Sequence, residues 1–513
     1  MLDDFDVLVY GGTAGGVISA VTAARQGLRV ALLEPRAHLG GMVTGGLSAT
    51  DHGEKQAIGG SSLEFYERLG RHYDREIEWY PEPHAAEKAF QEMVGEADRL
   101  TVFYQHRLKE KGGVEKAGEY ITKIGMENGS VFRATVFIDA SYEGDLMAQS
   151  GVSYTWGREG VDQYRESLAG VRPRDRNHQF DVPVSAYDEH ANLLPEIQTG
   201  LRGELGDGDQ KIQAYNFRMI LTSDRENRVP FPKPPDYSAE RYGLLARFLA
   251  AFVRQEGRPP RFDEIFLPRE VANRKWDFNN RGPFSTDYIG KNWEYPNAGY
   301  GRRTEIWQDH VNYTRGLFYF LTHDPQVPKP LQEELNLFGL AKDEFVENEN
   351  WPYQLYVRES RRMVGDFVMT QKDIQTELTK PDAIGMGSYN SDSHNVQRYV
   401  TGQGHAQNEG NMEVPVAPYQ IPYRILLPRT GQVANLLVTV CFSASHVTYS
   451  TLRMEPVYMI VGQAAGVAAW MAIDQKSRLH DINTAALTAM LRSQGAIVEL
   501  NADHIQSQSP RLE

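Results

Sequence analysis

Cysteine is almost absent from this sequence: Cys441 is the only one among 513 residues. A single cysteine excludes an intramolecular disulfide, and it also excludes the paired thiols that dithiol redox enzymes use. The sequence lacks a basic amino-terminal segment followed by an apolar run, because a strand-like stretch begins at Phe5. Without such a signal peptide, we expect a cytoplasmic protein.

An excess of positive charge is also missing. Lysine and arginine number 54 against 68 acidic residues, which gives a formal net charge of −14 and a pI near 5.6. This charge argues against a nucleic-acid partner or an anionic membrane surface, because both would repel the protein. The most apolar stretch, residues 456–473, contains Gln463 and two glycines. We expect a buried helix there, and no membrane span.

The length exceeds what one hydrophobic core usually supports. We find no repeat or low-complexity tract. We therefore expect a nucleotide-binding domain interrupted by a large insertion. The predicted domains are residues 1–155 (nucleotide-binding, first part), 156–400 (an α+β substrate-binding insertion) and 401–513 (nucleotide-binding, last part, with carboxyl-terminal helices).

The amino-terminal residues predict a strand, a glycine turn, a helix and a second strand. Residues 5–10 are typical of a strand, residues 17–25 of a helix, and residues 28–33 of a strand parallel to the first by the right-handed crossover rule. The turn between the first strand and the helix is Gly11, Gly12, Thr13, Ala14, Gly15 and Gly16. The fold class predicted here is α/β, with a Rossmann-like parallel sheet.

This unit has the chemistry of a dinucleotide site. Its glycines allow a diphosphate to approach the helix amino terminus, and Glu34, 23 residues after Gly11, is placed to accept hydrogen bonds from a ribose. Thr13 stands where the middle glycine of the pattern is expected, and its hydroxyl could donate to phosphate. The alternative is an ordinary strand-turn-helix unit without a ligand.

A second glycine-rich segment follows at residues 39–47, where glycines occur as the doublets Gly40-Gly41 and Gly45-Gly46. Glycine lets the backbone pass close to a neighbour because no Cβ intervenes. A flat ring system lined by main-chain amides explains this pattern, and a flexible loop is the alternative.

These segments, with residues 136–146, 443–446 and 462–466, resemble the FAD-dependent oxidoreductases of the fumarate-reductase/glutathione-reductase type. Within that type, the sequence resembles a bacterial family of xanthan-lyase-associated proteins over most of its length. The resemblance implies FAD as cofactor, Glu34 and Arg36 at its adenosine half, and Gly40-Gly41 along its diphosphate. It implies these FAD-binding residues: Gly11, Gly12, Thr13, Ala14, Gly15, Gly16, Glu34, Pro35, Arg36, Gly40, Gly41, Met42, Thr44, Gly45, Gly46, Arg107, Asp139, Ala140, Ser141, Glu143, Gly144, Pro456, Gly462, Gln463 and Ala464.

The carboxyl-terminal part predicts a loop at residues 422–429, a last parallel strand at 435–440 and a helix opened by Glu455-Pro456. Proline suits the first turn of a helix, and a helix amino terminus aimed at a flavin stabilises negative charge on the reduced ring. The alternative is a core helix that only packs on the sheet.

Candidate catalytic residues come mainly from the insertion. Residues 213–218 alternate like a strand. Asn280 can bind a polar ligand or simply make a turn. Residues 356–362 predict a helix with Arg358 and Arg361 on one face, which can hold a substrate carboxylate or form exposed ion pairs.

Histidine suits proton transfer because its pKa lies near neutral pH. His446 follows the last strand of the sheet and is expected beside the cofactor, and His394 is expected to complete the pocket. For each, a purely structural histidine is the alternative. His38 and His52 flank the glycine-rich loop and offer a site for covalent FAD attachment, with solvent-facing loop histidines as the other interpretation.

The function expected is hydride transfer between the flavin and a small polar substrate. This substrate is expected to bear hydroxyl or carboxylate groups, and a sugar-like compound is one possibility. One alternative is an FAD monooxygenase acting on an aromatic or natural-product substrate, and another is a non-catalytic FAD-binding protein. No metal site is predicted. The residues leave open the electron acceptor (oxygen, NAD(P), quinone or another), the direction of reaction and whether the chain forms a homo-oligomer.

Overall fold

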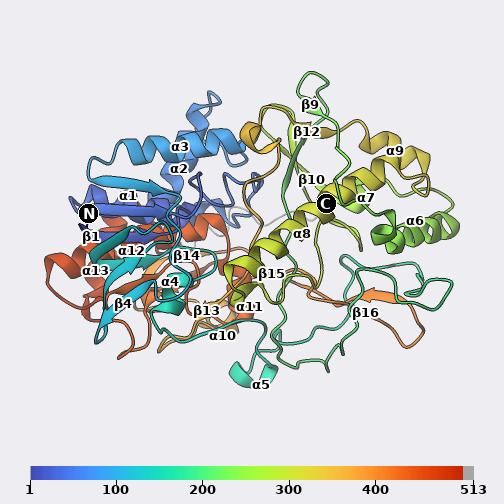
Figure 1. Cartoon of the computed structure of the whole chain (residues 1–513). Coiled ribbons are helices and arrows are strands. Elements are labelled where there is room, and N and C mark those ends of the chain that lie inside the picture. The colour runs from blue at the N-terminus through green and yellow to red at the C-terminus, as the bar shows by residue number, and fades with distance from the viewer. Residues whose placement is uncertain (1, 501–513) are drawn as a thin grey trace.

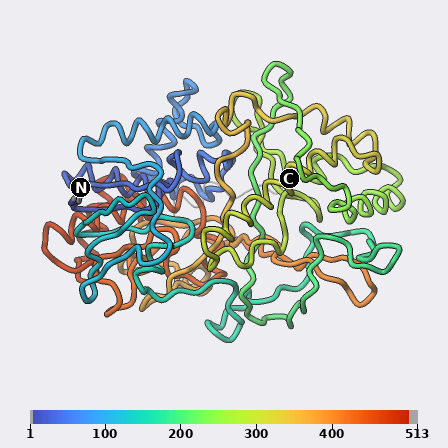
Figure 2. The backbone as a smooth tube through the Cα atoms, in the orientation of Figure 1, coloured from blue at the N-terminus to red at the C-terminus, as the bar shows by residue number. Residues whose placement is uncertain are grey.

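The computed structural model describes residues 2–500 and has two lobes (Figure 1). The lobe that holds the amino terminus is built from the first and the last parts of the chain, so that blue and red segments lie together in Figure 2. The other lobe comes from the middle of the chain, coloured green and yellow. The first lobe is therefore complete only after the chain has returned from the second.

A seven-stranded sheet forms the centre of the first lobe. Five of its strands are parallel: β3 (Leu100–Tyr104), β2 (Val30–Glu34), β1 (Leu2–Tyr10), β6 (Val131–Asp139) and β20 (Leu436–Val438). β4 (Val114–Ala117) and β5 (Tyr120–Gly125) add an antiparallel hairpin beside β6. The predicted α/β class with a parallel sheet is confirmed.

Helix α1 (Ala14–Arg25) begins three residues before the predicted start because Thr13 caps it. The Thr13 side chain accepts a hydrogen bond from the Gly16 amide at 3.1 Å, which satisfies an amide that has no acceptor inside the helix. The glycine turn is thus the cap and first turn of α1.

Helix α12 (Glu455–Asp474) packs across α1 at glycines. A Cβ on Gly462 would lie 2.3 Å from the Gly15 carbonyl oxygen, and one on Gly466 would lie 2.7 Å from the Ser19 carbonyl oxygen. By length and composition α12 could cross a membrane, but 89% of its apolar window is buried inside the protein. Its apolar sequence is accounted for by its burial, which includes the contacts with α1, and the expected buried helix is confirmed.

The other helices of the first lobe are α2 (Gly60–Arg71), α3 (Pro83–Gly95), α4 (Asp145–Gln149), α11 (His446–Leu452) and α13 (Thr484–Ser493).

The second lobe contains a five-stranded antiparallel sheet in the order β10-β11-β8-β12-β9. Its strands are β10 (Phe266–Val271), β11 (Lys275–Asn280), β8 (Met219–Thr222), β12 (Gly339–Ala341) and β9 (Arg228–Val229). The helices α5 (Val161–Tyr164), α6 (Gly243–Glu256), α7 (Phe262–Ile265), α8 (Tyr300–His323), α9 (Lys329–Leu335) and α10 (Gln371–Gln375) also come from the middle of the chain.

Short antiparallel pairs complete the structure: β7 (Tyr154–Thr155) with β13 (Arg362–Met363), β14 (Ala383–Gly387) with β19 (Tyr419–Pro422), β15 (Ser391–Ser393) with β18 (Met412–Val414), and β16 (Arg398–Val400) with β17 (Ala406–Asn408).

Three local predictions were wrong. Residues 356–361 are extended and not helical, because their buried arginines pair with carboxylates in different directions rather than sharing a helix face. Asn280 ends strand β11 instead of making a turn. Residues 213–218 are extended, but the regular strand begins only at Met219, and the segment makes one isolated bridge between Asn216 and Tyr356.

An ionic cluster joins the two lobes around Lys275 of β11. Its ammonium group lies 2.6 Å from the Glu82 carboxylate, 2.7 Å from that of Glu344 and 2.8 Å from that of Asp343. Glu82, Glu344 and His84 also have the spacing of metal ligands, with their ligand atoms within 4.8 Å of one another. Because the buried ammonium contacts all three carboxylates, we describe the cluster as an ion-pair network between α3 and the second sheet.

Candidate active site

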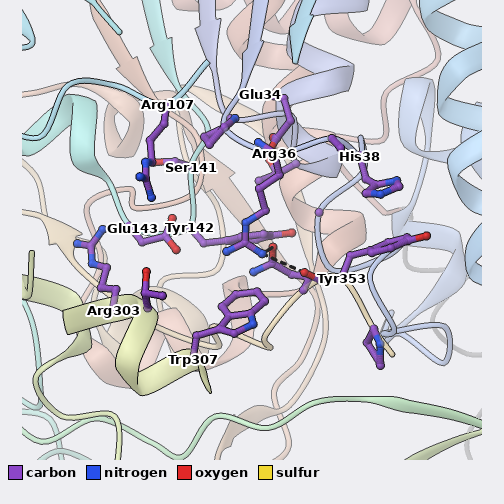
Figure 3. A pocket seen from close by; sticks show the side chains of 18 of the residues that line it. Glu34, Arg36, His38, Arg107, Ser141, Tyr142, Glu143, Arg303, Trp307 and Tyr353 are labelled. Carbon is purple, nitrogen blue, oxygen red and sulfur yellow. Dashed lines mark hydrogen bonds between the residues drawn. The ribbon is translucent and has the colours of Figure 1, made fainter. Parts of the chain in front are cut away.

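A cavity of about 760 Å³ lies between the lobes, where β1, β2 and β6 end (Figure 3). Parallel strands direct their carboxyl ends to the same edge of a sheet, and ligands of such sheets bind there. Tyr10, Glu34 and Ser141 reach the cavity from this edge. Helix α8 and residues 347–354 of the second lobe form the opposite wall.

Glu34 stands at the end of β2 on the cavity wall, as predicted for a ribose-binding carboxylate. Its carboxylate accepts hydrogen bonds from the Gly12 amide at 2.8 Å and the Arg36 amide at 2.7 Å. Burial raises the pKa of Glu34 to about 7. The two amides fix the carboxylate in place, and its remaining lone pairs can accept from ribose hydroxyls.

The glycine turn brings the chain close to β6. Gly11 has a φ of +101°, and a Cβ there would lie 2.7 Å from the Ser141 amide nitrogen. The Thr13 hydroxyl donates to the Ala140 carbonyl oxygen at 2.8 Å. The expectation that this hydroxyl donates to a phosphate is wrong, because its proton is used to tie the turn to β6.

The first doublet of the second glycine segment is packed against Tyr142. Gly41 has a φ of +59°, and a Cβ there would lie 2.3 Å from the Tyr142 hydroxyl. That hydroxyl accepts from the Met42 amide at 2.8 Å and donates to Glu455 at 2.9 Å. Burial raises the pKa of Glu455 to about 8. Tyr142 thus links the glycine segment to the first turn of α12.

The second doublet meets the other lobe. A Cβ on Gly45 would lie 2.3 Å from the Gln354 side chain, and one on Gly46 would lie 2.5 Å from the Arg218 carbonyl oxygen. This close approach explains why the doublet needs glycine. At Gly45 and Gly46 the backbone therefore packs against Gln354 and Arg218.

The structure divides the predicted FAD-binding residues into two groups. Ten line the cavity: Gly11, Thr13, Glu34, Pro35, Arg36, Gly41, Thr44, Arg107, Ser141 and Glu143. The others lie outside its lining: Gly12, Ala14, Gly15, Gly16, Gly40, Met42, Gly45, Gly46, Asp139, Ala140, Gly144, Pro456, Gly462, Gln463 and Ala464.

Residues of the second group mostly shape the fold around the cavity. Asp139 accepts hydrogen bonds from Ser141 and from the Met147 amide, which fixes the turn after β6. Gln463 accepts from the Ser61 amide at 2.9 Å and so joins α12 to α2. Their roles are those of packing and turn residues in this structure.

His38 and His52 were considered for a covalent bond to FAD. Both ring nitrogens of His52 are engaged, with the Gly53 carbonyl at 2.7 Å and the Tyr80 hydroxyl at 3.1 Å. His38 contacts Glu87 at 3.1 Å and stacks on Tyr353. Both side chains are partly buried, so neither is the solvent-facing loop histidine of the other interpretation.

One face of α8 was missed by the sequence reasoning. Tyr300, Arg303, Thr304, Trp307, Gln308, Val311 and Arg315 all line the cavity. Their spacing of three and four residues is that of a single helix face. This spacing is visible in the sequence and could have identified the helix face. The neighbouring residues do not indicate which part of the protein this face contacts.

Four of the five candidate catalytic residues are joined in one buried hydrogen-bond network. The His394 Nδ1 atom lies 2.5 Å from the Asp287 carboxylate, and Arg358 pairs with the same carboxylate at 3.1 Å. The Asn280 side-chain oxygen accepts from the Asp287 amide at 3.3 Å. Burial, followed by the charge of Arg358, lowers the pKa of His394 to about 4, so its imidazole is neutral at neutral pH.

His446 belongs to the other end of this network. Its Nδ1 atom lies 2.8 Å from Glu359, whose carboxylate also accepts from Gln213 at 2.9 Å. The Gln213 side-chain oxygen in turn accepts from the His394 amide at 3.1 Å. In residues 2–500 we find no hydrogen bond to the Nε2 atom of either histidine. Each ring is therefore oriented through Nδ1 and keeps Nε2 for another partner.

Arg361 lies apart from the network. It donates to Asp145 at 2.6 Å, and Arg303 of α8 pairs with the same carboxylate at 2.7 Å. Asp145 lines the cavity, so Arg361 supports the cavity wall. Tyr215 connects the network to the cavity: its hydroxyl donates to the Glu359 carbonyl oxygen at 2.5 Å, and its ring packs edge-on against Tyr295 of the cavity lining at 5.4 Å. The carboxylate partners Asp287 and Glu359 were missed because their pairing is long-range.

FAD fits the residues of this cavity. It is large enough for a cofactor, since ligand cavities are typically about 300–1,000 Å³. Glu34 is placed for a ribose, and the Arg36 guanidinium has no carboxylate within 4.0 Å in residues 2–500, so it offers an unbalanced positive charge for a diphosphate. The fold and these features define a dinucleotide-binding α/β protein.

The chain belongs to the FAD dependent oxidoreductase family, whose sequence pattern matches residues 6–491. Its cofactor is accordingly FAD. A comparison with curated proteins found no match.

Solved structures similar to parts of this chain include two monooxygenases and a flavoprotein/dehydrogenase. p-Nitrophenol 4-monooxygenase PnpA from Pseudomonas putida DLL-E4 is 14% identical over 30% of this chain and 46% of its own, with a TM-score of 0.22. A flavin-containing monooxygenase from Stenotrophomonas maltophilia is 19% identical over 31% and 43%, with a TM-score of 0.21. A flavoprotein/dehydrogenase from Cytophaga hutchinsonii is 14% identical over 29% and 42%, with a TM-score of 0.23. The chain thus covers less than half the length of each.

Proposed function

We propose that the protein transfers a hydride between a small polar substrate and FAD, with His394 moving the accompanying proton. The observation that carries this proposal is the buried network of His394, Asp287 and Arg358 beside the FAD cavity. FAD supplies the hydride acceptor or donor when bound. We also propose that the protein is of the fumarate-reductase/glutathione-reductase type, within the xanthan-lyase-associated group, on the motifs described above.

The geometry of His394 suits proton transfer. Asp287 holds the Nδ1 side of the ring, so that the Nε2 side can accept a proton from a substrate hydroxyl. Arg358 is fully buried; its Nη2 atom pairs with Asp287, its Nη1 atom donates to the Ala214 carbonyl oxygen, and in residues 2–500 its Nε atom has no hydrogen-bond partner. A buried donor of this kind can orient a hydroxyl or carboxylate group of the substrate.

The proposal is tested by mixing the FAD-loaded protein anaerobically with a panel of hydroxy acids, sugars and sugar acids while flavin absorbance is recorded. We expect at least one of these compounds to bleach the flavin within seconds to minutes. A flavin that stays oxidised with all of them, but is reduced by NAD(P)H with oxygen uptake and substrate hydroxylation, would establish the monooxygenase alternative. A flavin that neither substrate nor donor reduces would favour a non-catalytic role.

The pH dependence of flavin reduction tests the role of His394 separately. A proton acceptor must be deprotonated, so the rate should be constant above about pH 5 and fall as the pH drops through about 4. Arg358→Gln removes the positive charge that lowers the pKa of His394, so the acidic limb should move to higher pH. Asp287→Asn removes the negative charge that raises this pKa, so the limb should not move upward.

Arg302→Gln serves as the control, because Arg302 is an exposed residue of α8 that pairs with Glu294 and Glu305. It should leave the limb unchanged. An acidic limb that stays in place in Arg358→Gln would exclude His394 as the group that titrates.

A further inference from the structure

We propose that Trp307 of α8 is the surface on which the adenine ring of bound FAD stacks, and that Arg36 leaves this surface to pair with the FAD diphosphate. The second lobe then binds the cofactor directly. This inference is independent of the substrate and of the reaction, because it concerns only the adenosine diphosphate half of FAD.

Trp307 presents its ring to the cavity from the second lobe (Figure 3). The Arg36 guanidinium lies over this ring, 3.9 Å from its centre. Phe217 supports the indole from another side in an edge-on contact at 5.5 Å. A half-buried indole held in this way offers a rigid, flat face of the kind on which nucleotide bases stack.

Among the described residues, Arg36 is the arginine of the cavity lining that has no acidic partner. Its guanidinium donates to the Tyr353 carbonyl oxygen at 2.9 Å and to the Gln354 side chain at 3.4 Å, and in residues 2–500 no carboxylate lies within 4.0 Å of it. The other arginines that line the cavity have acidic partners, namely Arg107 with Glu127, Arg303 with Asp145 and Arg315 with Glu349. A diphosphate is therefore the partner that Arg36 lacks.

The neighbouring aromatic rings are less available than Trp307. Tyr353 is covered by His38, whose ring lies parallel to it at 3.6 Å. Tyr300 lies under the Arg107 guanidinium, and Glu127 holds that guanidinium at 2.5 Å. The Arg36 guanidinium covers the Trp307 ring, and two neutral oxygens hold that guanidinium in place.

The position of Glu34 agrees with this assignment. Arg36 follows it by two residues, and the Arg36 amide donates to its carboxylate. The ribose that Glu34 would bind joins adenine to the diphosphate. A residue beside Glu34 can thus reach the diphosphate, while the base extends toward the wall formed by α8.

The test is equilibrium binding of FAD and of ADP to cofactor-free protein, followed by calorimetry and by quenching of tryptophan fluorescence. ADP carries the adenine and the diphosphate without the flavin. Trp307→Ala should weaken both ligands by the same factor, roughly 5- to 150-fold, as expected for loss of one base-aromatic stack. Trp307→Phe should retain most of the affinity but lose most of the fluorescence quenching.

Trp276→Ala is the matched control, because Trp276 lies on β11 against Phe338 and outside the cavity lining. It should leave both affinities unchanged, and circular dichroism checks that each variant is folded. Unchanged FAD affinity in folded Trp307→Ala would overturn the proposal. So would a loss for FAD with none for ADP, since Trp307 would then contact the flavin half.

Discussion

Replacement of His394 by glutamine is expected to slow flavin reduction by the substrate about 10²- to 10⁴-fold, the usual contribution of a general base. Glutamine can still donate a hydrogen bond to Asp287, so the buried carboxylate keeps a partner and the network stays folded. FAD content should be unchanged, because His394 does not line the cofactor cavity. Stopped-flow absorbance at the flavin band, under anaerobic conditions, measures the rate.

His405→Gln is the control for this variant. His405 is a partly exposed histidine between β16 and β17 of the same lobe, outside the network, and its loss should leave the rate unaltered. The result that contradicts the assignment is a His394→Gln protein that is reduced at the wild-type rate. His446→Gln then becomes the variant of interest, because His446 is the other oriented imidazole of the network.

Replacement of Lys275 by methionine should destabilise the folded protein by about 3–5 kcal/mol, the typical cost of breaking a buried ion pair by removing one partner. The side chain of Lys275 is fully buried, and without its ammonium group the buried carboxylates of Glu82 and Glu344 lose the positive charge that they share. Urea unfolding followed by circular dichroism measures the loss.

Lys372→Met provides the comparison, because Lys372 pairs with Glu377 at the surface, where an ion pair is worth less than about 1 kcal/mol. Adding Glu82→Gln and Glu344→Gln to Lys275→Met should recover part of the loss. Equal unfolding midpoints for Lys275→Met and Lys372→Met would mean that the cluster does not hold the lobes together.

The cofactor half of the protein could be predicted from the sequence because its signals are local. A strand, a glycine turn, a helix and Glu34 follow one another within about thirty residues, and each has its own pattern. The last parallel strand was predicted in the same way, but its neighbour was not: the structure pairs it with β6, where Leu436 lies opposite Phe137, nearly 300 residues earlier in the chain.

The rest of the site depends on long-range pairing that no local pattern encodes. Arg358 and Arg361 have the spacing of a helix face, but Asp287 and Asp145 draw them in different directions, and the chain is extended there. Trp307 lies on a helix whose face is visible in the sequence. That it meets the nucleotide-binding lobe follows only from the packing of the two lobes.

The return of the chain to the first sheet has a consequence for its synthesis. β6 is complete when residue 139 is made, but β20, its neighbour, ends at Val438. During synthesis, the β6 edge and the face of α1 that α12 covers therefore stay unpaired until about 300 more residues have been made. Most of these residues belong to the second lobe. Unpaired edges invite aggregation, so the nascent chain is exposed to this hazard until its last part has been made.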